Sequence, residues 1–74
     1  MKVYVYQLRV TVSDKEGFDS NQDIREVVAP DMSLEEAVAF MKLFAIKEWN
    51  YTNLEVRIDH VQKLYLLGII DKEN

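Results

Sequence analysis

Apolar residues recur with helical spacing between Ser33 and Trp49. At about 100° per residue, one broad face of such a helix collects most of them, and these are expected in the core: Leu34, Ala37, Val38, Met41, Phe44, Ala45 and Trp49. Ser33 and Glu36 have the spacing of a capping box, in which each side chain accepts a hydrogen bond from the backbone N–H of the other residue. Asn50 then offers a left-handed stop. The pattern predicts a helix over about residues 33–49.

The back of this helix is also partly apolar. Ala39, Leu43 and Ile46 follow the spacing i, i+4, i+7 on the side away from the broad face. A surface helix ordinarily has a polar back, so this stripe needs a cover. Either a loop or the C-terminal tail lies over it, or a partner protein does, because exposed apolar patches tend to mark contacts.

Two strands are predicted before the helix. Residues 3–12 alternate between apolar and polar positions, except that Val3 and Val5 make the first half apolar on both faces. Residues 24–29 form the second strand, and the proline that follows ends it. The polar stretch between these segments is expected to be a hairpin loop.

The chain after the helix allows two interpretations. Residues 54–58 alternate like a strand, whereas residues 60–70 are apolar on both faces if extended. Their β-branched and aromatic residues favour a fourth strand, but a short helix capped by Asp59 and stopped by Gly68 also fits. With the strand preferred, the prediction is one small α+β domain over residues 1–74. Its order is ββαββ, a four-stranded antiparallel or mixed sheet with one helix packed on one face.

Such a fold has more apolar surface than it can cover by itself. One helix protects one face of a sheet, and at roughly 25 cal/mol per Å² a wet apolar second face forfeits several kcal/mol. That loss is comparable with the whole stability of so small a domain. A second copy is the simplest cover, since two-fold dimers are the commonest oligomers, and a larger protein is the other. The predicted partner interface consists of Val3, Val5, Ala39, Leu43, Ile46 and Leu66.

Composition narrows the possible classes of protein. Hydrophobic residues make up 49% of the chain, which argues against disorder, and the lack of cysteine excludes disulfides and thiolate metal sites. No run approaches membrane-spanning length and no signal-peptide core is present, so a cytoplasmic protein is expected. The net charge is −4, and residues 13–36 alone carry eight acidic side chains against two basic ones. This balance disfavours binding to nucleic acid through its phosphates.

Motifs that could carry chemistry are incomplete. Asp19 to Asp23 has the D-x-N-x-D spacing that opens an EF-hand calcium loop, but Ile24 and Pro30 occupy the positions of the required Gly and Glu. His60 is the sole histidine, and no serine and carboxylate are placed to form a triad with it. No catalytic, cofactor-binding or metal-binding residue is predicted, and the chain is not expected to be an enzyme. The alternative is a small-molecule or weak metal-binding protein, or an enzyme whose site is assembled at a dimer interface. Either would use the acidic loop, His60 and Tyr65.

The expected function is therefore that of a small non-catalytic interaction or accessory protein, which forms a homodimer or docks on a larger protein. A hairpin, the motif A-P-D-x-S-x-E-E-A over residues 29–37 and a terminal strand follow one another. This order resembles that of short proteins from bacteriophages and mobile elements. The resemblance implies an inhibitor or accessory role, with the acidic segment 13–36 meeting a basic target. A nucleic-acid-binding fold with residues 59–70 as a helix is a further alternative, against which the acidic balance weighs.

Overall fold

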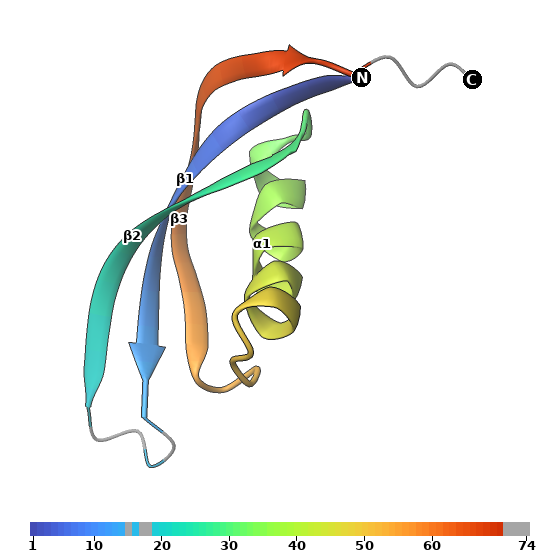
Figure 1. The fold of residues 1–74 in the computed structure, drawn as a ribbon. Helices are drawn as coiled ribbons and strands as arrows, with labels where there is room; N and C mark the ends of the chain where they lie inside the picture. The colour runs from blue at the N-terminus through green and yellow to red at the C-terminus, as the bar shows by residue number, and fades with distance from the viewer. Residues whose placement is uncertain (15, 17–18, 71–74) are drawn as a thin grey trace.

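A computed structural model describes residues 1–14, 16 and 19–70. In these residues the chain forms β1 (Lys2–Ser13), β2 (Ser20–Pro30), α1 (Leu34–Glu48) and β3 (Val56–Ile69). The strands make one antiparallel sheet in the order β2-β1-β3, and α1 lies across one face of it (Figure 1). The predicted α+β class, with one helix on one face of the sheet, is confirmed.

The predicted fourth strand is wrong. The residues assigned to two strands, 54–58 and 60–70, contribute to the single strand β3, which pairs with β1 along its whole length. Leu54 lies before β3, in the turn that follows the helix. The alternative helix over 59–70 is wrong as well. The described residues therefore have the order ββαβ with three strands.

Irregular pairing between β1 and β3 explains why the sequence suggested two strands. The register shifts at three points along β1: between Val3 and Tyr4, between Val5 and Tyr6, and between Arg9 and Val10. The β3 residues left without a partner at these shifts are Asp59, Leu64 and Leu67. Each extra residue changes the face on which the following side chains lie. A continuous strand with such bulges loses strict alternation, and this loss looked like a break in the sequence.

The core lies between α1 and the middle of β1. Tyr6, Leu8 and Val10 alternate onto the helix-facing side of the sheet and are fully buried. Ala37 and Met41 of α1 meet them and are also fully buried. The central strand of the sheet thus supplies three of the eight buried residues of this core cluster, more than any other element, as expected for a strand with a neighbour on each side.

Both ends of the helix are fixed by local hydrogen bonds that the sequence encodes. Ser33 Oγ accepts from the Glu36 N–H (3.1 Å) and Glu36 Oε1 accepts from the Ser33 N–H (3.0 Å), so the predicted capping box is confirmed. At the other end Asn50 has φ of 63°, which confirms the predicted left-handed stop. The buried Tyr6 hydroxyl adds a tertiary tie, donating to the Pro30 carbonyl (2.9 Å) and accepting from the Met32 N–H (3.1 Å).

The sheet covers only part of the broad face of α1. The buried line along the helix consists of Ala37, Met41 and Ala45. Leu34 and Val38, which were expected in the core, are 52% and 41% exposed. Val38 lies one turn before Lys42, whose ammonium donates to the Val56 carbonyl at the start of β3. This flank of α1 therefore overhangs β3, on the side where a fourth strand would have covered it.

Candidate interaction surfaces

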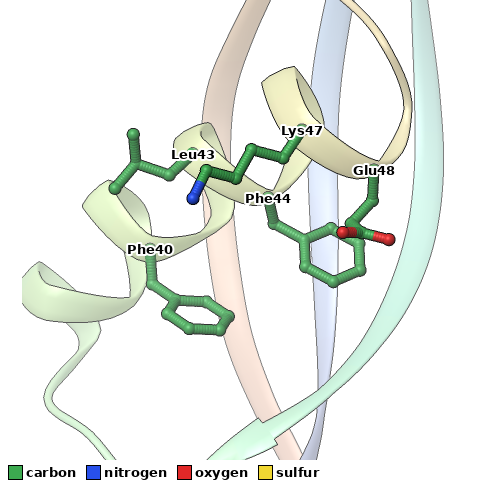
Figure 2. Close-up of a pocket in the computed structure, with 5 residues that line it drawn as sticks. All are labelled: Phe40, Leu43, Phe44, Lys47 and Glu48. Atoms are coloured by element: carbon green, nitrogen blue, oxygen red, sulfur yellow. The ribbon is translucent and has the colours of Figure 1, made fainter.

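The outer face of α1 carries a shallow apolar pocket of about 220 Å³. Its lining residues are Phe40, Leu43, Phe44, Lys47 and Glu48, which are drawn in Figure 2. Phe40 is 37% exposed and Leu43 is 59% exposed. The Phe40 and Phe44 rings are stacked, with centroids 6.4 Å apart and planes at 27°. An apolar ridge with a ring-lined hollow beside it is a shape that can accept a side chain of another molecule.

Aromatic contacts hold the inner wall of this pocket in place. The Phe44 ring meets the Trp49 ring edge to face, with centroids 5.4 Å apart. The Arg25 guanidinium of β2 lies 4.5 Å from the centre of the Trp49 ring and donates to the Tyr51 hydroxyl (3.1 Å). Arg25 Nε also donates to Asp23 (2.9 Å). These contacts clamp the end of α1 to β2, so the pocket sits on a supported part of the molecule.

The same outer face has opposite charges near its two ends. Glu36 lies in the first turn, and the N–H and hydroxyl of Ser33 hold the pKa of its carboxyl below the usual value, which keeps it ionised at neutral pH. Lys47 lies in the last turn, and within the described residues it forms no ion pair. Its side chain runs back along the helix toward Leu43 (Figure 2). Glu36 and Lys47 therefore lie at opposite ends of the apolar ridge, and Glu48 lines the pocket beside Lys47.

A second exposed apolar surface lies at the end of β3. Residues 64–70 contain no charged side chain. The members of this end that are at least 44% exposed are Tyr65, Leu66, Leu67, Ile69 and Ile70. Met1, also 44% exposed, lies beside them because its amino group donates to the Ile70 carbonyl (2.7 Å). β1 and β3 curve together toward this end, where the N-terminus lies (Figure 1). We call these six residues the β3 end.

The residues predicted as a partner interface do not form one continuous surface. Ala39 and Leu43 are exposed on the outer face of α1, and Ile46 beside them is half-buried. Leu66 belongs to the β3 end and is exposed. These four keep their place as interface candidates on two separate surfaces.

Val3 and Val5 lie on the sheet face away from the helix, and they are only 6% and 5% exposed. Their neighbours across the sheet account for this burial: Val5 pairs with Val28 on one side and Tyr65 on the other. Val28 and Tyr65, which are 53% and 55% exposed, carry the accessible surface of that face. The role of Val3 and Val5 in an interface stays a prediction.

Sequence reasoning missed Phe40 and Lys47 as members of the outer face. Phe40 belongs neither to the broad apolar face nor to the stripe of residues 39, 43 and 46. The signal that could have found it is the spacing of Glu36, Phe40, Leu43 and Lys47, which returns to one side of a helix every three or four residues. An acidic and a basic residue at the ends of such a row are ordinarily assigned to a solvent-exposed face, so these two were not assigned to the interface.

The residues considered for chemistry are not gathered into a site. Asp23 is bound to Arg25, and His60 is exposed and pairs across the sheet with Arg9. Within residues 1–14, 16 and 19–70, no three His, Cys, Asp or Glu side chains are close enough to share a metal ion. Asp59 accepts hydrogen bonds from the Thr11 hydroxyl and from Arg57 Nε (2.6 Å), and these two groups hold the pKa of its carboxyl below the usual value. A carboxylate held in this way is a structural acceptor and a poor proton acceptor.

In the part of the chain that the structure describes, no helix combines the length and the apolar character needed to cross a membrane. No protein family model, curated protein or solved structure matches the chain. The function is therefore argued from the two surfaces alone.

Proposed function

We propose that the protein is non-catalytic and acts by associating with other protein molecules, either its own copies or a larger partner. The contacts would be made through the outer face of α1 and the β3 end. An inhibitor or accessory role suits such a protein, because binding is then its whole activity. The proposal also includes a cytoplasmic location and a phage-like origin, both of which are expected from the sequence.

The observation that supports the proposal is the exposure of large apolar side chains in a chain that also has a packed core. Leu43 and the six residues of the β3 end are 44–70% exposed. Fully burying one Leu, Ile or Phe side chain contributes roughly 1.5–3 kcal/mol. Covering several of them would contribute a free energy comparable with the stability of a small domain. Apolar side chains that are gathered, and not scattered singly, are typical of contact surfaces.

The test compares the solution mass of the wild type with that of three variants. Leu43→Glu places a charge on the outer face of α1, and Leu66→Glu places one at the β3 end. Leu54→Glu is the matched control, because Leu54 is 90% exposed in the turn before β3 and belongs to neither surface. Sedimentation gives the mass, and circular dichroism checks that each variant is folded.

We expect the wild type to exceed the monomer mass of 8.7 kDa at high concentration. At least one of Leu43→Glu and Leu66→Glu should lower the mass without unfolding the chain, while Leu54→Glu should leave it unchanged. If the Leu54 variant loses mass as readily as the other two, the association is non-specific and the proposal fails. If Leu43→Glu instead unfolds the chain, the apolar stripe on α1 is part of the core.

A further inference from the structure

The side chains along the outer face of α1 are arranged so that two copies of this helix, placed antiparallel, complement each other. Glu36, Phe40, Leu43 and Lys47 fall within a sector of about 60° around the helix, at about 100° per residue. A two-fold axis that crosses α1 between Met41 and Lys42 reverses this order. Phe40 of one copy then lies opposite Leu43 of the other, and Glu36 lies opposite Lys47.

We infer that a second copy of this chain docks on this face, with the two α1 helices antiparallel. Two Phe40–Leu43 contacts form the centre of the interface, and two Glu36–Lys47 ion pairs close its ends. This inference rests on the proposed function and names the partner and the orientation.

The two charges are available for such pairing. Glu36 is exposed in the first turn, and its Oε1 is used by the capping box. Lys47 is exposed and forms no ion pair there. Ion pairs at the rim of an interface contribute little affinity, but they fix orientation. A parallel arrangement would place Glu36 against Glu36 and Lys47 against Lys47, so the charges favour the antiparallel one.

The middle of the face is shaped for close approach. Glu36 and Lys47 are eleven positions apart, so the contact runs for about 16 Å along the helix at 1.5 Å per residue. Ala39, which is small and exposed, falls opposite Phe44 of the other copy in the same register. A small residue facing a ring allows the helix axes to approach to the usual 8–10 Å or so. The Phe40–Phe44 pocket then receives side chains of the second copy.

The size of the face sets the expected strength. A standard interface takes roughly 800 Å² from each partner, and the whole accessible surface of this chain is 5350 Å². A face one helix wide supplies less than a standard interface, so the dimer should dissociate on dilution through the micromolar range. A tight, dilution-independent dimer would need a larger surface.

The β3 end is a poorer place for the second copy. The bulges at Leu64 and Leu67 interrupt its hydrogen-bonding edge, and bulges are one of the devices that protect edge strands from pairing. It also has no charge that could fix a register. The helix face is regular and carries both signs, so it specifies one arrangement.

The test uses charge reversal in mixtures. Lys47→Glu alone and Glu36→Lys alone each place like charges opposite one another at both ends of the interface. Each single variant should therefore sediment at 8.7 kDa at concentrations where the wild type is dimeric. An equimolar mixture of the two should recover twice that mass, because both ends become complementary in the mixed dimer. Glu35→Lys is the matched control for Glu36→Lys: it adds a lysine about 100° around the helix and leaves both Glu36–Lys47 pairs in place, so by itself it should keep the wild-type mass.

Glu36→Lys also breaks the capping box, so a second measurement covers the case in which it does not fold. Lys47→Glu keeps the cap, and its dissociation should be reversed by salt, which screens repulsion between exposed charges. If both single variants remain dimeric, or if the mixture stays at 8.7 kDa, the inference is overturned.

If Leu66→Glu dissociates the dimer while Lys47→Glu does not, the second copy lies on the β3 end. In that case the inference fails and the proposed function stands. A wild type that is monomeric at every concentration overturns the inference and leaves a larger partner as the remaining form of the proposed function.

Discussion

The first half of β3, taken as residues 56–63, has three apolar residues and the second half, residues 64–69, has five, and the two also differ in charge and in cover. In the first half, Val56 and Val61 are 2% and 3% exposed under the helix, and charged residues such as Arg57 and Asp59 alternate with them. In the second half no residue is charged, and most side chains are exposed even though they are apolar. The first half has the pattern of a strand in a sheet with a single covered face. The other has the pattern of a strand in a sheet with two covered faces, yet the described part of the chain leaves most of its apolar side chains exposed.

This difference separates apolar residues that stabilise the fold from apolar residues that are free to bind. Apolar content alone does not make the distinction, because Leu8 and Leu66 are the same residue type on neighbouring strands. Position under α1 makes it, since α1 spans the covered part of the sheet and ends short of the other (Figure 1). The apolar residues past the reach of the helix are therefore candidates for binding, as are those on the outer face of α1.

The largest expected contrast comes from truncating one leucine in each region. Leu8→Ala removes a fully buried side chain from the central strand and should cost about 2–5 kcal/mol of unfolding free energy through lost burial and a cavity. Leu66→Ala removes a side chain that is 44% exposed and should cost less than about 1 kcal/mol in the monomer. Urea unfolding followed by circular dichroism, at a concentration where the chain is monomeric, measures both. Equal costs would show that the β3 end belongs to the core.

Substituting two tyrosines with phenylalanine gives a sharper contrast between the two regions with a smaller change, the loss of one hydroxyl group. Tyr6→Phe deletes a buried hydroxyl that donates to the Pro30 carbonyl and accepts from the Met32 N–H. Leaving those groups without a partner should cost about 1–3 kcal/mol. Tyr65→Phe is the matched control, because Tyr65 is 55% exposed and should unfold at the wild-type urea concentration. Similar midpoints for the two variants would contradict the role of Tyr6 in tying the helix entrance to the sheet.

Lowering the pH tests how much Asp59, in the charged first half of β3, stabilises the fold. The Thr11 hydroxyl, and after it Arg57, hold the pKa of the Asp59 carboxyl below the value of about 3.9 found in unfolded chains. The stabilisation from Asp59 is therefore fully present above that value and is lost as the pH falls through the lower, folded-state pKa. The wild type should be more stable than Asp59→Asn at neutral pH, and the difference should shrink in acid. Urea unfolding at several pH values measures it.

The control for the acid experiment is Glu26→Gln, which removes an exposed carboxylate of β2 that has no ion pair in the described residues. Its unfolding free energy should differ little from that of the wild type. A pH-independent difference for Asp59→Asn would show that the contacts of Asp59 act through packing alone.

The smallest expected effect is that of Gly68→Ala. A Cβ added at Gly68 meets no atom within 4 Å, so the substitution fits without any shift of its surroundings. The unfolding free energy should change by less than about 1 kcal/mol, and the sign should favour alanine because it reduces the freedom of the unfolded chain. A large loss of stability would show that the β3 end is more tightly packed than its exposure indicates.

Much of the fold could be predicted from the sequence because its determinants are local. The capping box of Ser33 and Glu36 and the left-handed Asn50 depend on residues a few positions apart, and the structure has all three. The alternation of β1 likewise follows from a strand with one covered face. These features do not depend on how the rest of the chain folds.

The strand count could not be predicted, since it depends on pairing between distant segments. The bulges at Asp59, Leu64 and Leu67 are visible only when β3 is laid against β1. The burial of Val3 and Val5 likewise depends on the neighbouring strands, where Val5 pairs with Val28 and Tyr65. The candidate surface was half found: Leu43 and Leu66 were identified from surplus apolar character, whereas Phe40 and Lys47 were missed although their spacing with Glu36 and Leu43 places them on one side of the helix.

The most direct test of the account is the mass of the unmodified protein over a dilution series. If the exposed apolar surfaces serve association, sedimentation should give a mass above 8.7 kDa at high concentration that falls toward 8.7 kDa on dilution. A mass of 8.7 kDa at every concentration would contradict self-association and would leave a larger partner as the remaining form of the proposed function.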